Sequence, residues 1–131
     1  MRALYTSLYA SLPSSVPLSF DGVYDSSVSQ QELFDTEVLP HIDTRVFSGC
    51  TATLFCYGMT GTGKSHTMNG QFGNPGLIPR TMKHLFDSIQ DRIACGEQNA
   101  ESTIVSCSYF ELFNEKIYGQ KEKNCEMEQT Q

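Results

Sequence analysis

Residues 51–68 read TATLFCYGMTGTGKSHTM. The first seven of them are apolar, aromatic or β-branched, and they are enclosed by Gly49 and Gly58. A run this short and this rich in such side chains favours a strand buried on both faces over a helix. The strand is expected to lead straight into a glycine-rich turn and then into a helix.

The turn matches the pattern G-x-x-x-x-G-K-[ST], which is typical of a phosphate-binding loop when a strand precedes it and a helix follows. Its glycines, Gly58, Gly61 and Gly63, tolerate positive φ and let backbone N–H groups approach an anion closely. Lys64 would place its ammonium on the β- and γ-phosphate oxygens, and the Ser65 hydroxyl would be a ligand of Mg²⁺. The permissive positions are occupied by Met59, Thr60 and Thr62.

Upstream of the loop, the sequence predicts a helix that begins near Ser29. The pair Ser29 and Glu32 matches a capping box, in which side chains satisfy free backbone amides. Apolar residues recur every fourth position from Phe34 to Val46 and form a stripe. Pro40 lacks a backbone N–H, so it should kink this helix or divide it.

Downstream of the loop, the clearest helical pattern runs from Ile78 to Ile93, with Pro79 suited to its first turn. A β-rich run follows from Thr103 to Phe113. Strand, turn, helix and strand in this order predict an α/β layer.

Composition excludes several classes of protein. The chain has 131 residues, which is enough for one domain. Its formal charge of -6 disfavours binding to nucleic acid. No apolar run approaches the ~18 residues of a membrane-spanning helix. The five cysteines include no C-x-x-C pair, which favours reduced thiols over a zinc site or a disulfide framework. We therefore expect neither a nucleic acid nor a membrane as partner.

The stretch from Thr53 to Met68 resembles the phosphate-loop segment of the kinesin motor domain, typically written T-[IV]-F-A-Y-G-Q-T-G-[ST]-G-K-[ST]-[YH]-T-M. Three further stretches agree with that family in order and spacing: Phe20-Asp21-x-Val23-Tyr24, Gly76-Leu-Ile-Pro-Arg80 and Ser108-Tyr-Phe-Glu-Leu-Phe-Asn-Glu-Lys-Ile-Tyr118. We expect a partial motor domain at residues 19–118. Residues 1–18 are expected to be poorly ordered or outside the family pattern, and residues 119–131 to form a polar, disordered tail.

The resemblance implies an α/β fold, the P-loop NTPase-type three-layer α/β/α fold of the kinesin motor, with an incomplete sheet. It implies ATP and Mg²⁺ as ligands and microtubules, that is tubulin, as partner of the full-length family member in the cytoplasmic cytoskeleton. His66 would lie beside the adenine; the plainer interpretation is an exposed histidine in the first helical turn. The nucleotide would be held by Gly58, Met59, Thr60, Gly61, Thr62, Gly63, Lys64, Ser65 and His66, with Ser65 on the metal.

Some elements of the family pattern are absent from the sequence. The first nineteen residues contain no R-x-R-P element, which packs on the adenine in kinesins. The motifs N-x-x-S-S-R-S-H and D-L-A-G-x-E, which sense the γ-phosphate and position the attacking water, would follow Tyr118 and are not present. In the kinesin sheet the strand at 51–57 lies between two strands that are missing here, so both of its edges would be open. We expect a truncated gene product, splice form or incomplete gene model.

The missing motifs leave the activity of this chain open. Phosphoryl transfer depends on positioning and charge stabilisation, so we expect at most weak nucleotide binding without turnover, and no microtubule binding by these residues alone. One alternative is a non-hydrolysing nucleotide-binding module. Another is an unrelated P-loop NTPase or kinase, which should carry arginines that clamp its substrate, whereas only Arg80 and Arg92 follow the loop.

Overall fold

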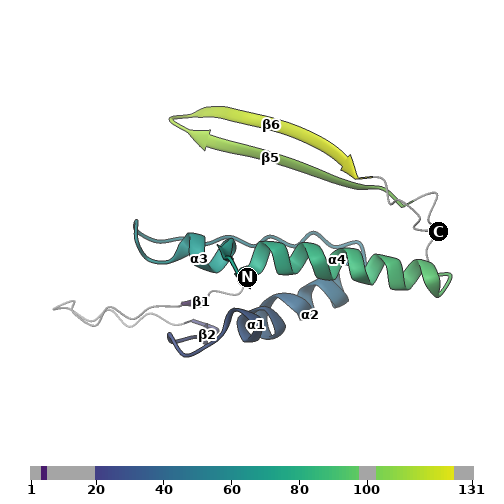
Figure 1. Cartoon of the computed structure of the whole chain (residues 1–131), viewed down its shortest axis with the longest axis horizontal. Coiled ribbons are helices and arrows are strands. Elements are labelled where there is room, and N and C mark those ends of the chain that lie inside the picture. The colour runs from purple at the N-terminus through teal and green to yellow at the C-terminus, as the bar shows by residue number, and fades with distance from the viewer. Residues whose placement is uncertain (1–3, 6–19, 98–102, 126–131) are drawn as a thin grey trace. The chain divides into compact units, whose positions relative to one another are not determined.

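The computed structural model describes residues 4–5, 20–97 and 103–125 (Figure 1). The chain divides into two units, residues 1–86 and 87–131, and the boundary falls within the longest helix. The first unit contains the glycine-rich loop and the helices around it. The second contains the end of the long helix and a hairpin of two strands.

A continuous helical stretch covers residues 30–46, in which α and π geometry alternate. Its parts are α1 (Gln30–Leu33), the π-helical turn η1 (Phe34–Val38), α2 (Leu39–His41) and the π-helical turn η2 (Ile42–Val46). The Ser29 hydroxyl accepts a hydrogen bond from the Glu32 backbone N–H at 3.0 Å, so the predicted cap is confirmed. Pro40 lies in α2, within this continuous stretch, where its missing N–H removes a backbone hydrogen bond, and a wider π turn precedes it. The predicted interruption at Pro40 thus takes the form of π turns on both sides of α2.

The apolar stripe of this stretch forms the core of the first unit. Leu33, Phe34, Val38 and Ile42 are buried together with Leu77 from the next long helix. Burial of each such side chain contributes about 1.5–3 kcal/mol. Val46, the last residue of the predicted stripe, is only half-buried. Buried Glu37 shares this face, where the Tyr24 hydroxyl donates a hydrogen bond to its Oε1.

The long helix α4 spans Leu77–Ala94, which confirms the helix predicted over 78–93. A short antiparallel pair precedes it, β3 (Gly70–Gln71) and β4 (Asn74–Pro75). Gly70 and Gly76 meet so closely there that a Cβ on Gly76 would lie 2.5 Å from the Gly70 nitrogen. Only glycine fits at such an approach.

Two further pairs of strands complete the described structure. β1 (Leu4–Tyr5) pairs in parallel with β2 (Gly22–Val23), so a strand lies within the segment 1–18 that the sequence assigns to no family element. β5 (Val105–Phe113) pairs antiparallel with β6 (Lys116–Cys125). The strand predicted over 103–113 is confirmed.

The hairpin extends into the predicted tail. Strand β6 runs to Cys125, whereas the sequence predicts a disordered tail from residue 119, and residues 126–131 lie outside the described residues. Strands pair through backbone hydrogen bonds, which do not require apolar side chains. The polar composition of residues 119–125 therefore does not prevent strand formation. The two residues between the strands, Asn114 and Glu115, have φ of 49° and 60°, as a two-residue hairpin turn requires.

The buried strand predicted over residues 51–57 is not present. These residues are not paired as a strand, and Phe55 and Tyr57 are 66% and 95% exposed. A strand forms only when its backbone groups are paired, and among the described residues none pairs with this segment. The sheet is therefore incomplete, as expected: the described strands form separate two-stranded pieces.

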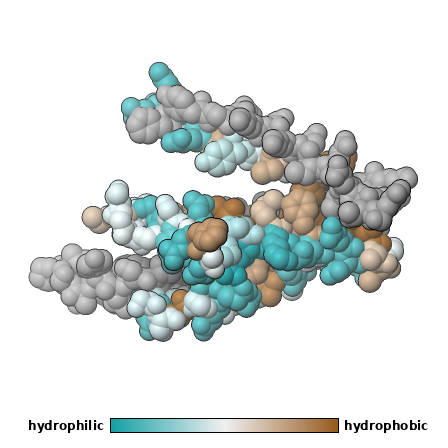
Figure 2. All heavy atoms as spheres, in the orientation of Figure 1, coloured by the Kyte–Doolittle hydropathy of each residue, from teal (hydrophilic) through white to brown (hydrophobic). Residues whose placement is uncertain are grey.

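The core is thin for a chain of this length. None of the described side chains is less than 2% exposed, and Figure 2 shows hydrophobic spheres scattered at the surface among hydrophilic ones. The described helices include none that is both long and apolar enough to cross a membrane. The large apolar side chains that remain exposed are Val23, Leu54, Phe55, Tyr57, Met59, Phe72, Ile78, Ile104, Tyr109 and Phe110.

Candidate functional site

The glycine-rich loop has the backbone geometry that its sequence predicts. Gly58, Gly61 and Gly63 have φ of 150°, 83° and 88°. Positive φ is strained for residues that carry a Cβ, so the three glycines are needed where they stand. The helix α3 (Lys64–Met68) begins directly after Gly63, which confirms the predicted order of turn and helix.

Hydrogen bonds within the loop fix the conformation of its backbone. Thr62 bonds to the Met59 carbonyl twice, through its hydroxyl at 2.8 Å and its backbone N–H at 3.4 Å. A Cβ on Gly58 would lie 2.9 Å from the Thr62 Oγ1, so the loop also needs glycine there for steric reasons. The shape of the loop is therefore determined by its own residues.

The Lys64 ammonium lies over this loop. Its Nζ donates to the Gly58 carbonyl at 2.8 Å and to the Met59 carbonyl at 2.6 Å. An ammonium has three donor protons, so it can bond the loop and an anion at the same time. Lys64 thus carries a positive charge at the start of α3, where the backbone amides already favour an anion.

The backbone amides of the loop are mostly unpaired. Within the described part of the chain, seven of the eight N–H groups of residues 58–65 have no hydrogen-bond acceptor in the protein, and the exception is that of Thr62; five of the seven lie between Thr60 and Ser65. Successive free N–H groups beside one ammonium form an arrangement that suits phosphate oxygens. The residues present therefore fit a phosphate group.

A metal would have few protein ligands at this loop. The described residues include no group of three or more His, Cys, Asp or Glu side chains that could hold an ion. Mg²⁺ is usually held by one or two protein oxygens together with phosphate oxygens and water. The exposed Ser65 hydroxyl at the start of α3 fits that pattern.

Cys56 lies just before the loop and is half-buried. Burial raises the pKa of its thiol, and the positive charge of Lys64 opposes this with a smaller effect. The thiol is therefore held in its neutral form, which is neither a good nucleophile nor a metal ligand.

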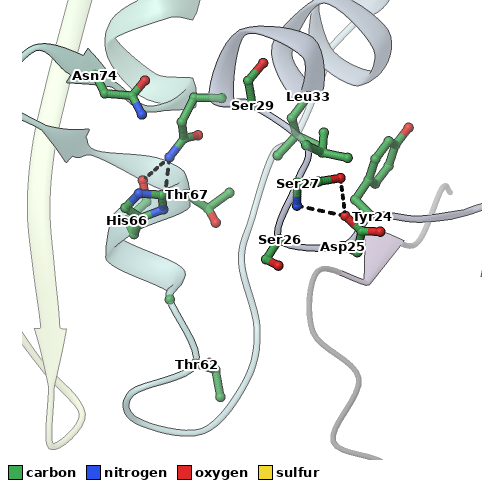
Figure 3. A pocket seen from close by; sticks show the side chains of 13 residues that line it. Tyr24, Asp25, Ser26, Ser27, Ser29, Leu33, Thr62, His66, Thr67 and Asn74 are labelled. Atoms are coloured by element: carbon green, nitrogen blue, oxygen red, sulfur yellow. Dashed lines mark hydrogen bonds between the residues drawn. The ribbon is translucent and has the colours of Figure 1, made fainter.

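A cavity of about 430 Å³ lies beside the loop (Figure 3). Its walls come from residues between 24 and 33, around the start of α1, and from the end of the loop and α3, together with Asn74. Of the nine predicted site residues, Thr62, Gly63 and His66 line this cavity. His66 itself is exposed in the first turn of α3.

Asp25 and Ser27 form a turn at the wall of the cavity (Figure 3). The Asp25 Oδ1 accepts from the Ser27 backbone N–H at 2.8 Å and from its hydroxyl at 2.6 Å. Hydrogen bonds to the ionised form lower the pKa of the Asp25 carboxyl, the hydroxyl having the larger effect. The cavity thus has one carboxylate among its lining residues, and it is held in its ionised form.

Gln30 is a site residue that sequence reasoning missed. It is only 6% exposed, and its Nε2 donates to the His66 carbonyl at 2.6 Å and lies 3.1 Å from the His66 Nδ1. Gln30 precedes Phe34 by four positions, so it continues the buried stripe. A polar residue in register with an apolar stripe was the signal that could have revealed it.

Comparisons with known proteins show which family the chain is similar to. The kinesin motor domain family matches residues 11–130. Kinesin-like protein KIP2 of Eremothecium gossypii is 43% identical over 100 residues, which are 76% of this chain and 14% of that protein. Kinesin-like protein KIF3C of Mus musculus is 40% identical over 110 residues, which are 80% and 13% of the two chains. The chain therefore spans about one seventh of the length of these relatives.

Solved structures of kinesins are also similar to this chain. The Drosophila kinesin family member Kin10/NOD in complex with divalent manganese and ADP superposes with a TM-score of 0.68 at 25% identity, covering 89% of this chain and 46% of that one. KIF14 with ADP in complex with a microtubule has a TM-score of 0.57 at 34% identity, with coverage of 77% and 28%.

Proposed function

Because the chain belongs to the kinesin motor domain family, we propose that its glycine-rich loop, residues 58–65, binds the phosphate groups of ATP. The observation that carries this proposal is the set of five unpaired backbone N–H groups between Thr60 and Ser65, next to the Lys64 ammonium. Donors in this number and order suit a polyanion better than any neutral ligand.

Each part of the site has a role in this proposal. The loop amides and Lys64 hold the β- and γ-phosphates, and the Ser65 hydroxyl contributes one oxygen to Mg²⁺. The bound ion would neutralise phosphate charge. His66 lies beside the adenine, which is supported by its exposed ring and its place in the wall of the cavity. Kin10/NOD, a similar protein, forms a complex with manganese and ADP, which supports a nucleotide with a divalent ion.

Membership of the family supports a proposal for the activity of the whole protein. Kinesins are microtubule motors, and the similar KIF14 is recorded with ADP on a microtubule. We propose that the protein couples ATP hydrolysis to movement along microtubules and that it works on the cytoplasmic microtubule cytoskeleton. An unrelated P-loop kinase is no longer a candidate, because the chain belongs to the kinesin family.

A non-hydrolysing nucleotide-binding module is the second candidate, for residues 1–131 alone. Of the residues that line the cavity, Asp25 is the one acid, and its pKa is lowered by two hydrogen bonds from Ser27. A carboxylate with a lowered pKa is a weak general base. This favours binding over turnover within the described residues.

Titration calorimetry with Mg-ATP tests the proposed binding. Lys64→Ala removes one charge-assisted hydrogen bond to phosphate, so we expect affinity to fall about 10- to 100-fold. Lys116→Ala removes the same charge from an exposed position in the hairpin and should leave the affinity unchanged. Equal affinity of the Lys64→Ala variant and the unaltered chain would show that the loop is not the site. Phosphate release at background in the chain that binds ATP would support the second candidate.

A further inference from the structure

The buried Gln30 side chain contacts both the backbone and the ring of His66. Its Nε2 is 2.6 Å from the His66 carbonyl oxygen and 3.1 Å from the His66 Nδ1. We propose that Gln30 is a positioning residue that fixes the tautomer of the neutral His66 ring, so that the ring presents its Nε2–H to an acceptor atom of the nucleobase. This inference rests on the proposed nucleotide binding and assigns the hydrogen bond that His66 makes there.

The orientation of the Gln30 amide follows from the His66 carbonyl. A carbonyl oxygen only accepts, so the amide atom 2.6 Å from it must be a donor, which is Nε2. The reversed amide would place two acceptors at this distance, and it is therefore excluded. The other amide atom, Oε1, is buried and has no hydrogen-bond partner among the described residues, so it does not oppose this orientation.

The orientation of the amide in turn determines the tautomer of His66. An amide nitrogen carries two protons, and with one on the His66 carbonyl the other is available to Nδ1. Nδ1 therefore accepts, because a proton on Nδ1 would oppose the proton of the amide. In a neutral imidazole one nitrogen accepts and the other donates. The proton of the His66 ring is thus on its Nε2.

The Nε2 edge of the ring remains open to a ligand. His66 is exposed and lines the cavity of about 430 Å³ (Figure 3). Nδ1 faces the buried Gln30, so the exposed part of the ring includes the opposite edge, which carries Nε2. Within the described part of the chain, this Nε2 has no hydrogen-bond partner. The ring nitrogens of a purine are acceptors, and a donor that is already held in place loses less conformational entropy on binding.

The alternative is that Gln30 only joins α1 to α3 through the His66 carbonyl. In that case the tautomer of the ring would not depend on Gln30. The tautomer is therefore the property that separates a positioning role from a purely structural one.

NMR of the full chain labelled with ¹⁵N tests this, because the chemical shifts of the two ring nitrogens report which of them is protonated. The spectrum is recorded at about pH 8, where ordinary histidines are neutral. We expect His66 to show the Nε2–H tautomer alone. His41 is the internal reference: it has no hydrogen-bond partner among the described residues, so it should show a mixture of both tautomers. Addition of Mg-ADP should shift the Nε2–H signal of His66 and leave that of His41 in place.

Variants separate Gln30 from the rest of α1. Gln30→Met keeps the length of the side chain and removes both donor protons, so the ring shifts of His66 should move to those of His41. Gln31→Met makes the same substitution at the exposed neighbour in α1 and should leave the ring shifts unchanged.

Calorimetry with Mg-ADP then tests whether Gln30 acts through the ring. Gln30→Met and His66→Ala should each lower the affinity about five- to tenfold, the effect of one hydrogen bond. The double variant should bind ADP within about twofold of His66→Ala alone, because the two residues act as one unit.

The outcomes distinguish this inference from the proposed function. A proton on Nδ1 of His66, or ring shifts that Gln30→Met leaves unchanged, would overturn the role of Gln30 while nucleotide binding stands. Additive losses in the double variant would overturn it as well. If the chain binds no ADP, the proposed function fails, and the role of the His66 Nε2–H fails with it. The spectrum of the unaltered chain needs no substitution, so it remains decisive where circular dichroism shows that Gln30→Met does not fold.

Discussion

Gly76→Ala tests whether the close approach before α4 holds the glycine-rich loop in place. A Cβ at this position would lie 2.5 Å from the Gly70 nitrogen, 2.6 Å from the Thr67 carbonyl oxygen and 2.7 Å from the Met68 carbonyl carbon. Ordinary van der Waals contact begins at 3.4 Å, so these atoms must move by 0.9, 0.8 and 0.7 Å. All three belong to the backbone and cannot rotate away. Overpacking of this kind costs about 3 kcal/mol of the free energy of unfolding, or more.

Gly73→Ala is the matched control, because the turn between β3 and β4 is open there. A Cβ on Gly73 meets nothing within 4 Å, and its φ of 78° costs alanine about 1–2 kcal/mol. Urea unfolding followed by circular dichroism gives both values. Thr67 and Met68 belong to α3, so Gly76→Ala should also weaken ATP binding, whereas Gly73→Ala should not. The reasoning is refuted if Gly76→Ala destabilises the chain no more than Gly73→Ala.

Two further predictions concern the segment around the start of α1. Ser29→Ala removes the cap of this helix and should lower the free energy of unfolding by about 1 kcal/mol, whereas Ser29→Asp should keep most of it; equal losses in urea unfolding would contradict the cap. The Asp25 carboxyl has a pKa lowered from 3.8 by Ser27, so its contribution to stability is complete above pH 3.8 and is lost as the pH falls through the lower folded value. In Ser27→Ala, which removes the larger of the two effects, an NMR titration of Asp25 should give a pKa closer to 3.8, and an unchanged value would exclude the hydroxyl as the cause.

The cap at Ser29, the long helix α4 and the positive φ of the loop glycines are all predictable from sequence. Each depends on residues only a few positions apart. A hydroxyl reaches an amide three residues on, and a glycine adopts positive φ because of its own lack of a Cβ. Local geometry of this kind is already determined in a short segment, so the pattern G-x-x-x-x-G-K-[ST] was sufficient to find the loop.

The strand predicted over residues 51–57 is absent, which shows that sequence patterns alone do not predict strand pairing. The apolar and β-branched side chains of this segment suit a sheet. A strand also needs hydrogen bonds between its backbone and neighbouring strands. Among the described residues no such neighbour pairs with it, and Tyr57 is 95% exposed. Composition alone does not reveal whether that partner is present.

The contact between Gln30 and His66 joins positions 36 residues apart, and no spacing rule connects them. Their distance depends on how α1 packs beside α3, just as the cavity depends on the segment around Asp25 lying next to the loop. Short-range chemistry therefore identifies the glycine-rich loop at residues 58–65. Long-range packing, in which burial energy brings distant segments together, decides which side chains surround it.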